Sequence, residues 1–350
     1  MPRQGNKSKW RSIAIASLVP VFLNGSAEAQ QSDQPGGPQN ERVRLPDPVQ
    51  RALTSVVALR AAIPPTARSA EQLGTERAGH GVVIGEEGLV LTVGYLIMEA
   101  DSVEIIEAGG RRVSATVLAY DYESGFGLLR TAIPLRAKPL PFGDSDVLKF
   151  RDVVTVAGHG GEDMAQRAVV VDRREFAGYW EYLLENAVFT SPPFGLFGGA
   201  ALLGDDGSLL GIGSLFVGDA YRAHGGTLPG NMFIPINRLK PIYDLMREGR
   251  RPPGSKPWIG VYTQEVQGRL IIAYVSPGSP AELAGLRRGD IIRDVAGTEV
   301  EAVADFYRKL WASGTSGSTV KLGIERDGIP EDVLVRSTDR YKYLKLDPTL

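Results

Sequence analysis

The chain contains no cysteine and only three histidines. The absence of cysteine excludes disulfides, thiol catalysis and cysteine-based metal sites. The histidines, His80, His159 and His224, are too scattered to form a ligand cluster, so we expect neither a metal nor any other cofactor. Acidic and basic residues are nearly balanced, at 41 against 39, and give no electrostatic signature of nucleic-acid binding.

Residues 1–29 have the pattern of a cleavable secretory signal peptide. Basic residues precede an apolar stretch at residues 13–23, which is too short to span a bilayer. Residues 27–29, Ala-Glu-Ala, match the small-residue pattern of a signal-peptidase site. We therefore predict a secreted chain that starts at Gln30 and has no integral membrane span. An uncleaved membrane anchor is the alternative.

Turn-forming residues are abundant, with 42 glycines and 23 prolines, which suits a mainly β protein with many turns. Short apolar runs alternate with turns between residues 79 and 131, and a second set follows between residues 153 and 235. In the second set we expect a strand at residues 179–185 and a loop at residues 221–230.

The first of these runs, residues 79–92, resembles the opening hairpin of the HtrA/DegP family of trypsin-type serine proteases. In that family the hairpin leads to a Thr-Asn-Asn-His turn that carries the general base. Here residues 92–95 read Thr-Val-Gly-Tyr, so Tyr95 stands where the resemblance places the histidine. A phenol is a poor base near neutral pH, because its phenolate form is scarce there.

The other two triad positions of the family are also replaced. The family's Asp lies in a Thr-Asp-Leu-Ala-Leu-Leu-Lys strand, and the matching residues 124–130 place Gly125 there. The family's nucleophile lies in Gly-Asn-Ser-Gly-Gly-Pro-Leu, and the matching segment places either Phe197 or Gly198 at the serine, depending on the alignment. Serine acyl transfer needs a hydroxyl, a base and an acid that orients the base. We therefore predict that the chain has no catalytic residue.

A relocated triad would need a different base and a different nucleophile. The three histidines lie in a glycine-rich hairpin and in loops, and we interpret them as loop residues without a catalytic role. Ser191 is the serine nearest to the lost nucleophile, but its threonine and proline neighbours do not form a nucleophile turn. The bulky side chains of Leu196, Phe197 and Trp180 favour a cleft that is filled rather than reactive.

Residues 258–340 resemble a bacterial PDZ domain, most specifically at residues 275–292. The resemblance implies that residues 258–261, Trp-Ile-Gly-Val, form a loop whose backbone N–H groups hold the C-terminal carboxylate of a peptide. The strand after this loop and a helix at residues 302–312 would form the walls of the groove. The predicted peptide-binding residues are Trp258, Ile259, Gly260, Val261, Tyr262, Phe306 and Leu310. Alternatively, Phe306 and Leu310 are ordinary core residues.

The predicted domains are a signal peptide (1–29), a disordered tether (30–48), a trypsin-like double six-stranded β-barrel (49–246), a linker (247–257) and an α+β PDZ domain (258–340). The resemblance implies a periplasmic HtrA-like pseudoprotease that binds unfolded or C-terminal peptide segments, as a chaperone, scaffold or regulator in protein quality control. Two alternatives stay open: an active trypsin-like serine endopeptidase with a remodelled site, and a non-catalytic partner subunit of active HtrA oligomers. Proteins of the family often form trimers, so the resemblance is compatible with a homo-oligomer.

Overall fold

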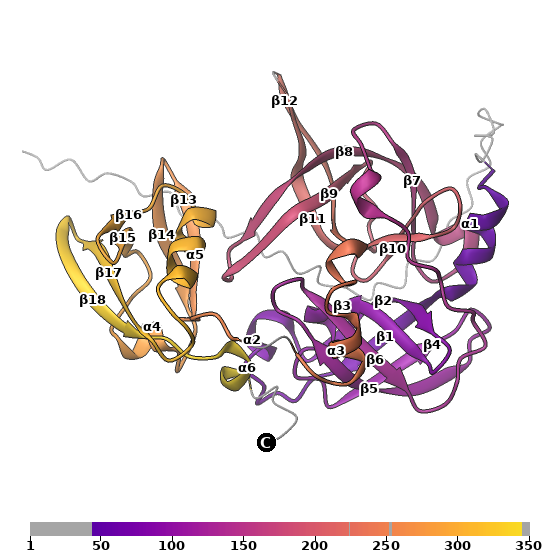
Figure 1. Cartoon of the computed structure of the whole chain (residues 1–350), viewed down its shortest axis with the longest axis horizontal. Helices are drawn as coiled ribbons and strands as arrows, with labels where there is room; N and C mark the ends of the chain where they lie inside the picture. The colour runs from indigo at the N-terminus through magenta and orange to yellow at the C-terminus, as the bar shows by residue number, and fades with distance from the viewer. Residues whose placement is uncertain (1–43, 224, 252–253, 345–350) are drawn as a thin grey trace, which may run out of the picture. The chain divides into compact units, whose positions relative to one another are not determined.

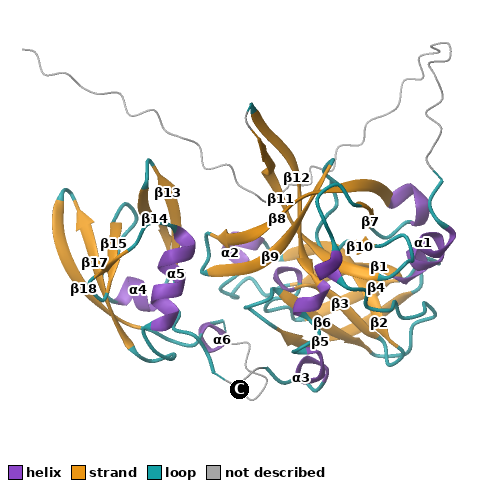
Figure 2. Ribbon diagram, turned by 45° about the horizontal axis from the view of Figure 1, so that its top comes forward, coloured by secondary structure: helices purple, strands orange, loops and turns teal. Residues whose placement is uncertain are grey.

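The structure, a computed structural model, describes residues 44–223, 225–251 and 254–344 (Figure 1). The predicted signal peptide, most of the predicted tether and His224 lie outside the described residues. Strands dominate the described part, as Figure 2 shows, which confirms the mainly β prediction. In this part of the chain no helix is long and apolar enough to cross a membrane.

The first barrel is an antiparallel, closed, six-stranded sheet with the strand order β1-β2-β3-β6-β5-β4. It closes because β1 pairs with β2 along one edge and with β4 along the other. Its strands fill the interior with apolar side chains, and β3 is buried along its whole length. The elements are α1 (Asp47–Ala52), β1 (Val56–Ala62), α2 (Ala70–Leu73), β2 (Glu76–Gly85), β3 (Leu89–Val93), β4 (Ser102–Ile106), β5 (Arg112–Tyr120) and β6 (Phe126–Thr131).

The second barrel repeats this architecture with the order β10-β11-β12-β9-β8-β7, and it closes through pairing of β10 with β7. The predicted trypsin-like pair of six-stranded barrels is therefore confirmed. The elements are β7 (Val153–Ala157), β8 (Ala165–Gly178), β9 (Tyr182–Ser191), β10 (Ala201–Leu203), β11 (Leu209–Ala223), β12 (Gly226–Pro235) and α3 (Tyr243–Arg247).

Two local predictions for the second barrel are wrong. The strand expected at residues 179–185 is instead the tip of the β8–β9 hairpin followed by the start of β9. The turn contains no glycine, proline or asparagine, the residues that usually mark a turn in a sequence. Its residue with positive φ is Glu181, at 54°. The loop expected at residues 221–230 is largely paired, because the β11–β12 ladder continues to Ala223 and Gly226 despite the glycines and the proline of that segment.

The third unit is a sheet of order β13-β14-β15-β17-β18, with the short β16 paired to β15. Helix α5 buries Val303, Phe306, Tyr307 and Leu310 against it, the i, i+3, i+4, i+7 spacing of an amphipathic helix. Strand β13 is an edge strand of this sheet. The elements are β13 (Val261–Val266), β14 (Arg269–Val275), α4 (Pro280–Leu283), β15 (Ile291–Val295), β16 (Thr298–Glu299), α5 (Val303–Ala312), β17 (Thr319–Arg326), β18 (Ile329–Arg336) and α6 (Arg340–Tyr343).

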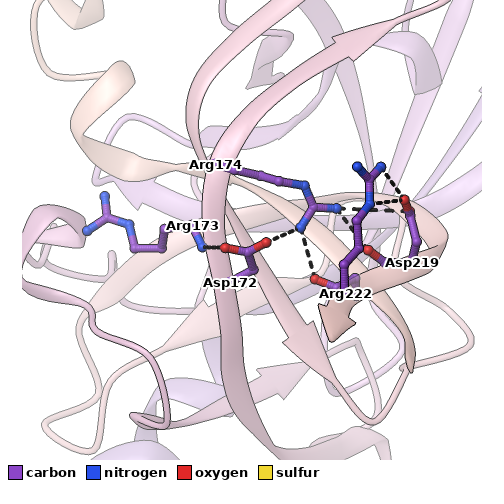
Figure 3. A network of polar contacts seen from close by, with 6 residues as sticks. Asp172, Arg173, Arg174, Asp219 and Arg222 are labelled. Carbon is purple, nitrogen blue, oxygen red and sulfur yellow. Dashed lines mark hydrogen bonds and ion pairs between the residues drawn. The ribbon is translucent and has the colours of Figure 1, made fainter. Parts of the chain in front are cut away.

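A polar network joins β8 to β11 through Asp172, Arg174 and Asp219 (Figure 3). The Arg174 guanidinium donates to the carbonyl oxygens of Asp219 at 2.9 Å and Ala220 at 3.0 Å, and it pairs with the Asp172 carboxylate. The same guanidinium lies 3.8 Å from the centroid of the Phe189 ring. One planar side chain therefore joins two strands and covers an aromatic residue of β9.

We expect Arg174→Lys to lower the free energy of unfolding by about 1–3 kcal/mol, because an ammonium cannot reproduce a planar fork of donors over a ring. Urea unfolding of the purified protein measures this. Arg222→Lys is the matched control, since Arg222 is exposed and pairs with Asp219 at the rim of the network. Equal destabilisation by the two substitutions would contradict a special role for Arg174.

Candidate functional site

Tyr95 lies in a short helical turn, residues 94–96, directly after β3. Its hydroxyl donates to the carbonyl oxygen of Ser214 at 2.9 Å. A Cβ atom placed on Gly198 would lie 3.0 Å from the Tyr95 hydroxyl oxygen, so a side chain at position 198 would face Tyr95. Burial raises the pKa of Tyr95 above its usual value, so the phenol stays protonated and acts as a hydrogen-bond donor, not as a base.

This geometry favours Gly198 over Phe197 as the residue that faces position 95. The backbone around Gly198 is pressed against β2, because its carbonyl oxygen accepts a hydrogen bond of 2.8 Å from the His80 N–H. The next residue, Gly199, has a φ of +76°, and a Cβ there would lie 1.9 Å from the His80 carbonyl oxygen. Neither Phe197 nor Gly198 carries a nucleophilic atom, so this turn has no group that could attack a carbonyl.

Gly125 lies beside the same turn, since its carbonyl oxygen accepts a hydrogen bond of 2.8 Å from the Gly94 N–H. It has a φ of +84°, and a Cβ there would lie 3.0 Å from the Tyr182 hydroxyl oxygen. That hydroxyl donates to the Ser124 carbonyl oxygen at 2.8 Å. A tyrosine of the second barrel therefore lies against the position where the resemblance places an orienting carboxylate.

The described histidines do not supply a substitute base. The buried His80 ring accepts a hydrogen bond from the His159 N–H at its Nδ1, at 3.1 Å, and also hydrogen-bonds to the Leu196 backbone. Burial lowers the pKa of His80 to about 4, so the ring is neutral near pH 7. His159 Nε2 contacts the Glu107 carbonyl oxygen at 3.2 Å, and the Ser191 hydroxyl donates to the Pro229 carbonyl oxygen at 3.0 Å. These contacts do not form a nucleophile–base pair.

The loop before Gly198 is held by Asn231, which sequence reasoning missed. The fully buried Asn231 side chain accepts from the Phe194 N–H at 2.6 Å and donates to the Phe194 carbonyl oxygen at 3.2 Å. Its position next to the apolar run Met-Phe-Ile of β12 could have indicated this role. A buried amide side chain needs hydrogen-bond partners. Leu196 in this loop is 43% exposed, so the expectation that it helps to fill the cleft is wrong.

The loop before β13 presents three convergent backbone donors. The N–H groups of Ile259, Gly260 and Val261 donate to the carboxylate of Glu181, at 3.3 Å to Oε2 and at 2.7 and 3.1 Å to Oε1. Gly260 has a φ of +88°, and a Cβ there would lie 2.4 Å from the Ser279 Cβ. Glycine is therefore needed at this position, and the loop is an anion-binding turn of backbone amides.

The other predicted peptide-binding residues do not converge on these donors. The Trp258 ring packs on Tyr343, at 4.4 Å between centroids, and the Tyr262 hydroxyl donates to the Gln72 side chain. Phe306 and Leu310 are both fully buried in the core of the third unit. Among the described residues, no group of three or more histidine, cysteine, aspartate or glutamate side chains could hold a metal ion.

Tyr307 of α5 is a second residue that sequence reasoning missed. Its hydroxyl donates to the Gly178 carbonyl oxygen at 2.7 Å, accepts from the Glu181 N–H at 3.0 Å and lies 3.2 Å from Thr263 Oγ1. Its place on the predicted groove helix could have indicated this role, because the hydroxyl of a buried tyrosine needs hydrogen-bond partners.

Comparisons with known proteins agree with this architecture. The family profile of the trypsin-like peptidase domain matches residues 79–212, and that of the PDZ domain matches residues 257–336. The chain therefore matches a trypsin-like peptidase domain followed by a PDZ domain. In this order of domains it is similar to proteins of the HtrA/DegP type.

Two curated relatives of the HtrA/DegP type illustrate the similarity. The periplasmic pH-dependent serine endoprotease DegQ of Escherichia coli is 27% identical over 269 residues, which cover 74% of this chain and 59% of DegQ. The serine protease Do-like HtrA of Lactobacillus helveticus is 27% identical over 295 residues, which cover 76% of this chain and 69% of that protein. This chain thus spans less than two thirds of the length of DegQ.

A solved structure shares the fold. A variant of the HtrA-type protease AlgW with a decapeptide matches with a TM-score of 0.50 at 19% sequence identity, covering 84% of this chain and 96% of that one. At this identity the likeness concerns the fold alone.

Proposed function

We propose that this HtrA/DegP-type chain is a pseudoprotease. It binds unfolded or C-terminal peptide segments through its PDZ domain and does not hydrolyse peptide bonds. The observation that carries this proposal is the contact between positions 95 and 198. A protonated, hydrogen-bonded phenol faces a glycine where a serine protease of this fold needs a base that faces a hydroxyl.

In this proposal, no residue takes the place of the triad aspartate that would orient the base. Gly125 adjoins the Tyr95 turn through a backbone hydrogen bond, and Tyr182 occupies the space next to it. Because a triad acts as a unit, loss of any one member removes most of the rate, and here all three positions lack the required group.

The PDZ domain supplies the proposed binding function. Three backbone donors form a carboxylate site next to the edge strand β13, and this is the pairing of features with which a peptide C-terminus is captured. Capture of exposed C-termini or unfolded segments suits a chaperone, scaffold or regulatory role. The signal-like residues 1–29 and a relative that is named periplasmic support a periplasmic location.

We expect no cleavage of labelled denatured casein by the purified protein and no labelling by a fluorophosphonate probe, because both need an activated serine hydroxyl. DegQ from Escherichia coli, treated in parallel, is the positive control. Turnover that survives repurification and disappears with a serine-protease inhibitor would favour the active endopeptidase instead. Mass spectrometry of the labelled residue would then locate its nucleophile.

A further inference from the structure

The turn at the tip of the β8–β9 hairpin, residues 179–181, lies in the place where the PDZ domain would take a peptide. The Thr263 N–H of edge strand β13 donates to the Tyr179 carbonyl oxygen at 3.0 Å. This single bond uses a backbone donor of the open sheet edge, the kind of group with which a bound peptide strand pairs.

The Glu181 carboxylate takes the part of a C-terminal carboxylate in this arrangement. It accepts from all three N–H groups of the loop at residues 259–261, and the residue is only 5% exposed. Glu181 lies two residues after Tyr179. One three-residue turn therefore contacts both the sheet edge, through the Tyr179 carbonyl oxygen, and the loop at residues 259–261, through the Glu181 carboxylate.

Further contacts hold the hairpin tip against the PDZ domain. Tyr307 binds the backbone on both sides of the turn, at Gly178 and Glu181. Ala177 and Leu183, which flank the turn, pack against the PDZ core, and Glu175 of β8 pairs with Arg308 of α5. The hairpin tip is therefore bound through backbone, carboxylate and apolar contacts, the three kinds of contact that a peptide ligand makes.

We propose that Glu181 is a built-in ligand of the carboxylate-binding loop, and that an external peptide with a free C-terminal carboxylate binds only after it displaces the hairpin tip. This inference rests on the proposed function, since it concerns the regulation of the same site. It assigns the PDZ groove two states. In the closed state the hairpin tip occupies the groove, and in the open state the loop donors are available.

The test measures peptide binding by the purified full chain from residue 30, without and with Glu181→Ala. The probe is a fluorescein-labelled hexapeptide, Phe-Ala-Gly-Tyr-Trp-Leu, which copies residues 176–180 of the hairpin and ends in an apolar residue with a free carboxylate. Its apparent dissociation constant is the intrinsic value divided by the open fraction, so Glu181→Ala should tighten binding at least about tenfold. The amidated hexapeptide should not bind either protein.

Glu185→Ala is the matched control. It removes the same charge from the same hairpin, but Glu185 is exposed on β9 and pairs with Arg238, away from the carboxylate loop. Its affinity for the free-acid peptide should equal that of the unaltered chain. Tight and equal binding by the unaltered chain and by Glu181→Ala would overturn the built-in ligand and leave the proposed peptide binding standing.

Amide hydrogen exchange separates the two proposals if neither protein binds the peptide. In Glu181→Ala the Gly260 and Val261 amides lose their carboxylate acceptor and should exchange at least about tenfold faster, whereas Glu185→Ala should leave them unchanged. Faster exchange without peptide binding would support the closed contact and count against the proposed function. Unchanged exchange would overturn the closed contact itself.

Discussion

The triple variant Tyr95→His/Gly125→Asp/Gly198→Ser is expected to remain at least about 10³-fold slower on casein than DegQ, although it restores all three residue types of the triad. Catalytic groups must be placed within about 0.5 Å of the productive geometry. The Asp side chain at position 125 would start 3.0 Å from the Tyr182 hydroxyl, and its backbone would keep a φ of +84°. The new side chain therefore fits only if the Tyr182 hydroxyl shifts by a few tenths of an ångström, and it starts from a left-handed backbone.

The same contact predicts the stability of the single variant Gly125→Asp. We expect it to lose about 2–4 kcal/mol, from the left-handed backbone and from overpacking against Tyr182. Gly110→Asp separates these causes, because Gly110 has a similar φ of +78° with no atom within 4 Å of an added Cβ. Urea unfolding should show a loss of only about 1 kcal/mol for Gly110→Asp.

Casein turnover by the triple variant at the rate of DegQ would contradict the first prediction, because it would show that positions 95, 125 and 198 had kept a catalytic geometry.

Peptide affinity is expected to rise with pH between about 4.5 and 7. Burial raises the pKa of Glu181 from 4.5 to about 7, against the opposing effects of Arg340 and of the N–H groups of residues 259–261. The carboxyl group is protonated in both states below pH 4.5, and the closed state is then most favourable. Between pH 4.5 and 7 the closed state holds a proton that the open state has lost, so closing weakens by up to about tenfold per pH unit.

Fluorescence anisotropy of the free-acid hexapeptide from pH 5 to pH 8 measures this effect. The peptide carboxyl group is ionised throughout that range and adds no pH dependence of its own. Two other charged or titratable groups face Glu181: Arg340 of α6 and Tyr307 of α5. Burial raises the pKa of the Tyr307 phenol and Arg340 stays charged, so neither titrates between pH 5 and pH 8. Glu181→Ala should bind the peptide with nearly constant affinity across this range. An equal change of affinity with pH in both proteins would show that the pH dependence does not come from Glu181.

The architecture could be predicted from local sequence because its signals are local. Alternating apolar runs and glycine-rich turns indicated the barrels, and the resemblance to a PDZ domain implied the helix at residues 302–312. The replaced cleft residues were visible for the same reason, since Tyr95 and Gly125 each stand in a short motif. The choice between Phe197 and Gly198 needed the structure, because only the distance to Tyr95 separates two alignments that differ by one residue.

The contact between Glu181 and the loop at residues 259–261 could not be predicted, because it joins distant parts of the chain. Glu181 and Gly260 are 79 positions apart, and Glu181 by itself reads as an ordinary surface residue. The turn that carries it lacks glycine and proline, so it was interpreted as part of a strand. The contact of Tyr182 with Ser124 and Gly125 could not be predicted either, because no sequence motif around Tyr182 indicates it.

Glu181 belongs to the same chain as the loop that it binds, and under the proposal above this affects which ligands can displace it. A tethered competitor acts at an effective concentration that dilution cannot lower, and for short flexible connections this is in the millimolar range. A single weak C-terminus at micromolar concentration would leave the groove closed. Under the proposed function, a ligand that presents many C-termini at once would raise the local concentration enough to open it. The hairpin tip would thereby set a threshold that distinguishes crowded, multivalent clients from isolated ones.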